Sequence, residues 1–162
     1  MNRSFTYLTI LTISLLTTRA ATAAEYHLVL SPENTEITFV LEATGHDVHG
    51  TMVLESGDVT FDPETGAASG QLVLDVSKTE TGNKSRDKTM HKKVFETETY
   101  PQITFAARQV AGELPASGAG EIRFTGTLSI HGDDHEVMLP VSLKVEGDRF
   151  EATAQLSVPY VE

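Results

Sequence analysis

Residues 121–156 read EIRFTGTLSIHGDDHEVMLPVSLKVEGDRFEATAQL, and the period-two pattern of this stretch decides the fold class. Apolar side chains recur at every second position from Ile122 to Ile130, again from Val137 to Val145, and again from Phe150 to Leu156. Turn-forming residues separate the three runs, namely Gly132-Asp133-Asp134 and Gly147-Asp148. The pattern predicts antiparallel strands with one apolar face, joined by hairpins.

The same alternation occurs in the earlier part of the chain. It covers Tyr26–Leu30, Ile37–Ala43, Val59–Phe61, Leu72–Val76 and Ile103–Phe105. Strands at this spacing are typical of an antiparallel sandwich or barrel. Most phenylalanines lie at inward positions, where they would fill the core of a sandwich or line a cavity in a barrel. Alternation alone does not choose between the two.

Residues 82–96 break the strand pattern. They are good helix formers, and Met90 and Val94 stand four apart on one helical face. Thr81 or Asn83 would cap the start, and Pro101 prevents the helix from continuing into the next strand. The sequence therefore predicts one short helix inserted between two strands.

The N-terminus resembles a secretory signal peptide covering residues 1–23. Arg3 precedes an apolar stretch of about twelve residues, too short to span a bilayer, and Ala21-Thr22-Ala23 fits a cleavage site. We therefore expect a periplasmic or secreted domain of residues 24–162, with no stable membrane insertion after cleavage. The chain has no cysteine, so disulfides and thiolate chemistry are excluded.

Charge is unevenly distributed along the chain. The formal net charge is −11, and without residues 1–23 it becomes −13, because Arg3 and Arg19 are lost and no acidic residue is. Such a charge disfavours nucleic acid and anionic surfaces as partners. However, five of the ten remaining basic residues lie within 84–93.

This segment carries a resemblance to a known family. Thr81-Gly82-Asn83, Arg86-Asp87, Met90, Phe95 and the run Tyr100–Phe105 resemble the signature of the YceI-like polyisoprenoid-binding family. Further matches are Val48-His49-Gly50, Val59–Asp62, Gly126–Gly132 and Leu139-Pro140-Val141. The resemblance covers nearly the whole chain after residue 23.

The resemblance implies a single antiparallel, extended, lipocalin-like β-barrel with one short helix in an insertion over the mouth. It implies an exported, non-catalytic protein that carries or sequesters a long isoprenoid lipid, such as a quinone or a polyprenyl phosphate, and requires no cofactor. Family members generally continue into one further strand after the position of Val158, so the last strand is expected to be missing here.

Two sets of site residues follow from the pattern and the resemblance. The expected ligand-lining side chains are apolar: Phe39, Phe61, Leu74, Met90, Val94, Phe95, Phe105, Phe124 and Leu139. The expected headgroup or entrance side chains are basic: Lys84, Arg86, Lys88 and Lys92. We expect the lysines to meet a phosphate or a quinone carbonyl, and Arg86 to order the loop around Asp87 or the ligand.

The histidines suggest an alternative function, that of a metal-binding or redox accessory protein. His131 and His135 are expected to flank a three-residue hairpin loop and to face each other, with a third ligand from His46, His49, Asp133 or Asp134. The spacing matches no established zinc motif, so a metal is not favoured. A barrel with a filled interior is a further alternative. No nucleophile elbow, phosphate-binding glycine loop or paired-carboxylate motif occurs, so we expect no enzyme.

Overall fold

The computed structural model describes residues 25–41, 47–147 and 149–158. It contains eight strands and one helix: β1 Tyr26–Leu30, β2 Ile37–Leu41, β3 Val48–Asp62, β4 Ala67–Glu80, α1 Lys84–Lys93, β5 Gln102–Gly112, β6 Gly118–Ile130, β7 Asp133–Glu146 and β8 Arg149–Ala154. The expected signal peptide, residues 1–23, and His46 lie outside the described residues. Within the described part, no helix is long and apolar enough to cross a membrane.

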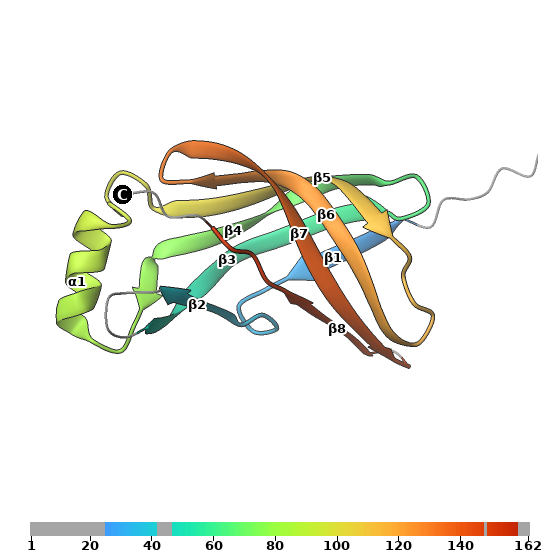
Figure 1. The fold of residues 1–162 in the computed structure, drawn as a ribbon, viewed down its shortest axis with the longest axis horizontal. Helices are drawn as coiled ribbons and strands as arrows, with labels where there is room; N and C mark the ends of the chain where they lie inside the picture. Colours follow the sequence, from blue (N-terminus) through green and yellow to red (C-terminus); the bar gives the residue numbers. More distant parts are fainter. Residues whose placement is uncertain (1–24, 42–46, 148, 159–162) are drawn as a thin grey trace, which may run out of the picture.

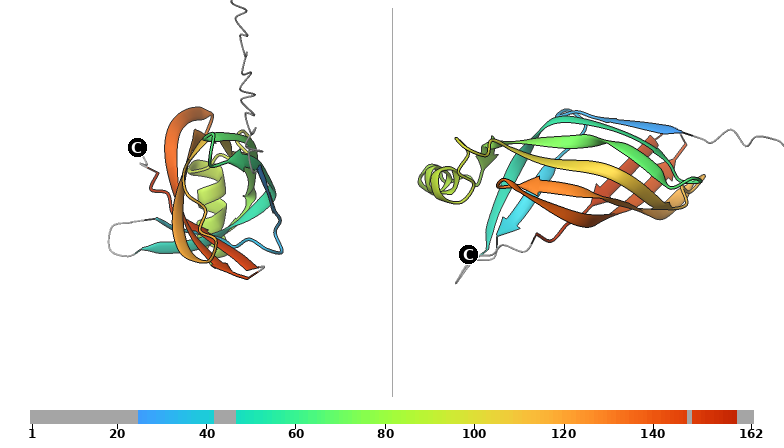
Figure 2. Two further views of the ribbon diagram at one scale, coloured as in Figure 1. Left: turned by 90° about the vertical axis from the view of Figure 1, so that its right-hand side faces the viewer. Right: turned by 90° about the horizontal axis from the view of Figure 1, so that it is seen from above.

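All eight strands form one antiparallel sheet in the order β1-β3-β4-β5-β6-β7-β8, with β2 also paired to β3. β1 pairs with residues 57–61 of β3 and β2 with residues 48–52, so the two short strands follow one another along the same edge. The sheet is strongly curled into a half-barrel, and α1 lies at one end of it (Figures 1 and 2). The prediction of an antiparallel, barrel-type all-β fold with one short helix is confirmed.

The strand registers confirm the predicted inward face. Ile122 of β6 pairs with Val141 of β7, which pairs with Ala154 of β8, and paired residues share a face. Phe105 pairs with both Leu72 and Leu128. The predicted apolar positions therefore line the concave side of the sheet.

The centre of this concave face is tightly packed. Phe61 and Phe124 meet edge to face with ring centroids 5.2 Å apart. Around them the apolar side chains with less than a tenth of their surface exposed are Val59, Val76, Ile103, Phe105, Ala107, Val110, Ile122, Leu128, Val141 and Leu143. Burial of each large side chain contributes about 1.5–3 kcal/mol, so this cluster stabilises the curl.

The end of β4 departs from the regular ladder. Thr51 of β3 pairs with Glu80, but Val53 pairs with Asp75, so residues 76–79 have only one β3 residue opposite them. The amide of Val76 instead donates to the carbonyl oxygen of Pro101 at 2.9 Å. This bond closes the base of the insertion that carries α1.

Candidate functional site

The helix is shorter than predicted, and Asn83 is its cap. The predicted segment was 82–96, whereas α1 covers Lys84–Lys93. The Asn83 side-chain oxygen accepts hydrogen bonds from the amides of Ser85 and Arg86, each at 3.1 Å. Phe95, expected at the helix end, instead follows it and packs against the core.

Thr81 joins Arg86 and Asp87 at the start of the insertion. Arg86 Nε donates to Thr81 Oγ1 at 2.7 Å, and Arg86 Nη2 donates to the Thr81 carbonyl at 2.8 Å. The Thr81 amide donates to the Asp87 carboxylate at 3.0 Å, and its hydroxyl donates to the same oxygen. Arg86 therefore orders this loop through Thr81, a residue to which the sequence analysis gave no such role.

A second contact joins the segment after α1 to the turn between β6 and β7. His131 Nε2 lies 3.0 Å from Glu96 Oε2, and the ring of Tyr100 lies 4.4 Å from that of His131. A Cβ on Gly132 would come within 2.7 Å of the Tyr100 ring. Glu96 and His131 are the two non-glycine residues with positive φ, 46° and 52°, in the described part of the chain. The insertion is thus held at both ends.

The turn between β6 and β7 differs from the one predicted for His131 and His135. β6 ends at Ile130 and β7 begins at Asp133, and these two residues pair, so the turn is His131-Gly132 and not a three-residue loop. His135 pairs with Leu128, so the prediction that His131 and His135 face each other is wrong. The physical reason is that both turn residues adopt positive φ, which a two-residue hairpin turn requires.

The candidate metal ligands are dispersed. His131 contacts Glu96, His135 is exposed on the concave side, and His49 is exposed on β3. Among residues 25–41, 47–147 and 149–158, no group of three His, Cys, Asp or Glu side chains could hold a metal ion.

A hollow of about 440 Å³ lies at the α1 end, where β2, β3 and the loop after β4 meet. Its lining residues, of which Phe39 and Val40 are the large apolar ones, are Thr38, Phe39, Val40, His49, Gly50, Thr51, Glu80, Thr81 and Gly82. The Phe39 ring lies directly over Gly50, because a Cβ there would be 2.4 Å from two ring carbons. One predicted lining residue therefore borders this hollow.

The other predicted lining residues lie at two levels of burial. Phe61, Phe105, Phe124 and Met90 are each less than a tenth exposed. Leu74, Phe95 and Leu139 are half-buried and pack against the core, and Val94 is half-buried just after α1. The centre of the concave face is therefore tightly packed. Between this centre and the α1 end, the apolar side chains of the concave face are only half-buried.

The lysines of α1 are exposed, whereas its arginine is not. Lys84, Lys88 and Lys92 are exposed, and Arg86 is half-buried. Met90 is the buried residue of the helix, 4% exposed. The predicted entrance side chains therefore lie at the end of the half-barrel, three exposed and one in the Thr81 contact.

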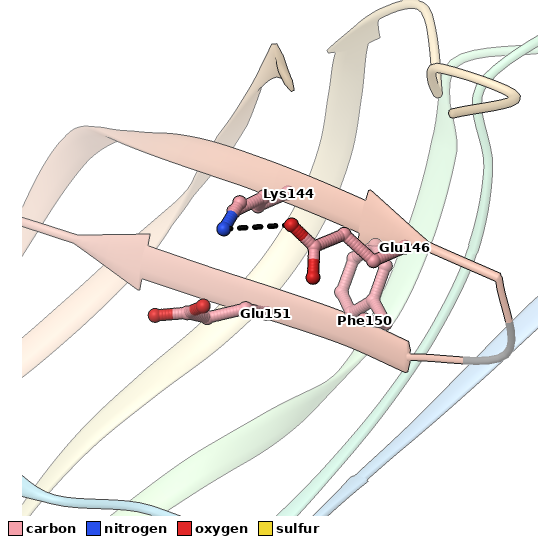
Figure 3. Close-up of a pocket in the computed structure, with 4 residues that line it drawn as sticks. All are labelled: Lys144, Glu146, Phe150 and Glu151. Atoms are coloured by element: carbon pink, nitrogen blue, oxygen red, sulfur yellow. Dashed lines mark ion pairs between the residues drawn. The ribbon is translucent and has the colours of Figure 1, made fainter. Parts of the chain in front are cut away.

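A second hollow, of about 260 Å³, lies on the β7–β8 hairpin and is lined by Lys144, Glu146, Phe150 and Glu151. Figure 3 shows the ion pair between Lys144 and Glu146, 2.8 Å apart, with Glu151 on the adjacent strand. Its lining is mostly charged, so it does not suit an apolar chain.

Two buried polar atoms near α1 have no hydrogen-bond partner among the described residues: Thr79 Oγ1 on β4 and His91 Nδ1 on α1. Thr79 is fully buried. Neither residue stands out in the sequence, because burial of Thr79 depends on the departure of residues 76–79 from the ladder.

On the same strand, hydrogen bonds from Ser77 and then Lys78 lower the pKa of Asp75.

Comparisons with known proteins agree with this architecture. BcnA of Burkholderia cenocepacia is 27% identical with a TM-score of 0.59, covering 74% of each chain. A polyisoprenoid binding domain from Saccharophagus degradans, implicated in plant cell wall breakdown, is 20% identical with a TM-score of 0.60, covering 80% of this chain and 74% of that one. No curated protein matches. The family described as YceI-like domain matches residues 28–159, and the chain therefore belongs to the YceI-like domain family.

Proposed function

We propose that the protein is an exported, non-catalytic carrier that holds an isoprenoid-like lipid, a quinone or a polyprenyl phosphate, against the concave face of its sheet. The observation that carries this proposal is the half-buried apolar surface between the packed centre and α1, with Phe39, Leu74, Phe95 and Leu139. Such a surface suits a chain that gains about 0.8 kcal/mol for each buried methylene. The description of the Saccharophagus degradans relative supports this ligand class.

The polar groups at the same end suit the head of such a lipid. His135 shares the concave face with Leu128 and is exposed, and a ring N–H can donate a hydrogen bond to a quinone carbonyl or a phosphate. Lys88 and Lys92 of α1 supply positive charge nearby. A few polar contacts at the mouth of an apolar site set ligand orientation and specificity.

Ligand uptake tests the proposal with a variant of β2 and a matched control variant of β1. Phe39 of β2 faces inward over Gly50, whereas Val29 of β1 is 56% exposed on the outer face, where it pairs with Asp58. We expect Phe39→Ala to weaken binding of ubiquinone-8 about tenfold, and Val29→Ala to leave it unchanged. Extraction and mass spectrometry of untagged protein should recover a prenyl lipid. Protein that neither carries such a lipid nor takes up ubiquinone-8 or undecaprenyl phosphate would refute the proposal.

The basic side chains allow the two lipid types to be distinguished. Replacing Lys88 and Lys92 with Ala should weaken binding of undecaprenyl phosphate and leave ubiquinone-8 nearly unaffected, because only the phosphate is charged. Equal loss for both lipids would contradict the headgroup role.

Export is tested separately from lipid binding. Periplasmic protein should begin at Ala24 or Glu25 by intact-mass analysis, since the expected cleavage follows Ala23. Recovery of the full-length chain in the cytoplasm alone would contradict export without affecting the lipid assay.

A further inference from the structure

Positive charge on the sheet and on α1 is arranged in two different ways. On the sheet, each basic side chain that the structure describes lies within 3.2 Å of a carboxylate: Lys78 with Asp75, Arg108 with Glu136, Arg123 with Glu121 and Lys144 with Glu146. None of the ion pairs between described residues involves a lysine of α1. The helix therefore carries the positive charge that the body of the protein does not neutralise.

Three of these lysines form a single row. Lys84, Lys88 and Lys92 are four residues apart, so they lie one above the other on one side of the helix. All three are exposed, while Met90 turns toward the body of the protein. Asp87, the acidic residue of the helix, has its carboxylate engaged by Thr81. We call Lys84, Lys88 and Lys92 the lysine row.

The position of α1 lets this row act independently of the acidic net charge. The helix lies beyond the strand ends at one end of the elongated half-barrel (Figure 2). At physiological ionic strength charges are screened over about 8 Å, so carboxylates farther along the sheet have little effect on a surface that meets α1. Three exposed acidic side chains flank the helix in sequence, Glu80, Glu96 and Glu98, and Glu96 contacts His131. On the helix itself four lysines and Arg86 outnumber the one acidic residue, Asp87, so the outer side of α1 is positive.

We propose that the lysine row docks the α1 end of the protein on an anionic lipid surface. None of the large apolar side chains that are exposed in the described part of the chain lies on α1; they are Tyr26, Val29, Val40, Met138, Phe150 and Val158. A protein partner would need buried apolar or aromatic anchors, whereas peripheral binding to lipid headgroups needs only clustered charge. An anionic bilayer therefore fits this surface better than an acidic protein does.

This inference rests on the proposed function for its purpose, because docking would bring the mouth of the lipid site to the membrane that holds the lipid. Strand β2, which carries the half-buried Phe39, lies at the same end of the sheet as α1 (Figure 1), and the half-buried Phe95 directly follows α1 in the chain. Binding through charge alone would be reversible and salt-sensitive. Such a surface allows repeated collection or delivery.

Vesicle cosedimentation of the purified protein, with no cargo lipid added, tests the inference. We expect binding to phosphatidylcholine vesicles that contain about one-third phosphatidylglycerol, no binding to phosphatidylcholine alone, and loss of binding near 1 M salt. Each lysine contributes about fivefold to the partition coefficient. Lys84→Gln/Lys88→Gln/Lys92→Gln should therefore weaken binding roughly a hundredfold, and glutamine preserves helix propensity.

The matched control removes the same charge from the sheet. Lys78→Gln/Arg108→Gln/Lys144→Gln changes the net charge equally but leaves the lysine row intact, so binding should fall less than about threefold. Circular dichroism and thermal unfolding confirm that both variants are folded. Equal loss in the two triple variants, or wild-type binding without the row, would overturn the proposal.

Two further outcomes identify which proposal has failed. Retention on immobilised polyglutamate that depends on the row, without vesicle binding, would assign the row to an acidic protein and overturn docking on lipid. Vesicle binding without uptake of ubiquinone-8 or undecaprenyl phosphate from detergent would support docking and refute the lipid-carrier function. Uptake of either lipid without vesicle binding would support the lipid-carrier function and refute docking.

Discussion

The close approach of Phe39 to Gly50 gives a sharp prediction for Gly50→Ala. The added Cβ would lie 2.4 Å from two carbons of the Phe39 ring and 2.7 Å from the Glu80 carbonyl oxygen. The ring is the end of a mobile side chain, but the carbonyl belongs to the backbone just before Thr81, which holds Arg86 and Asp87. The substitution therefore strains both a side chain and the start of the insertion.

The expected cost follows from these contacts. Overpacking of this kind costs about 1–3 kcal/mol, and for a chain of this length each 1 kcal/mol lowers Tm by about 3–4 °C. We expect the Tm of Gly50→Ala to fall by about 4–10 °C, with a smaller free energy of unfolding in urea. The hollow bordered by Phe39 should also change, which would lower affinity for ubiquinone-8.

A double variant separates the two contacts. Combining Gly50→Ala with Phe39→Leu removes the ring and leaves the contact with the Glu80 carbonyl, so we expect partial rescue and a coupling energy of about 1 kcal/mol in the double-mutant cycle. A Gly50→Ala protein within about 0.5 kcal/mol of wild type would refute the reasoning. Loss of stability without coupling would assign the whole cost to the backbone contact.

Three further perturbations follow from contacts described above. Asn83→Ala should lower the free energy of unfolding by about 1 kcal/mol in urea titrations, because the helix loses its cap; no change would contradict that role. Tyr100→Ala should speed amide exchange in residues 94–100 but not in the centre of β5, because the ring over Gly132 is lost; unaltered exchange would refute the contact. A hydrogen bond from Ser77 is the main cause that lowers the pKa of Asp75, so this carboxylate stabilises the fold above its ordinary pKa, and the gain disappears as pH falls through the lowered value; Asp75→Asn should flatten the acid limb of a stability–pH profile, and an unchanged limb would contradict this.

The assignment of strand side chains to the inward or the outward face is the part of the fold that the sequence predicted best. Pairs such as Phe105 with Leu128, or Val145 with Phe150, share the concave face as the alternation requires. This assignment is correct because successive residues of a strand point to opposite faces, whichever strands lie beside it. For the same reason it did not choose between sandwich and barrel, since curling of the sheet leaves the alternation unchanged.

The contacts at the ends of α1 were not predictable in this way. Thr81 has a role only because residues 86 and 87 return to it in space. The turn at His131 was assigned the wrong length because histidine is not among the residues typical of positive φ at that position. The helix itself was predicted because its residue preferences and cap are local signals.

The hydrogen bond between the Val76 amide and the Pro101 carbonyl has an evolutionary consequence. It brings the two ends of a 24-residue segment, residues 77–100, together at the rim of the sheet. A segment that leaves and rejoins its scaffold at one point can be exchanged as a cassette with little disturbance elsewhere. Natural variation or deliberate grafting in this segment can therefore change the charge and shape of the α1 end, while the strands and their packed centre stay the same.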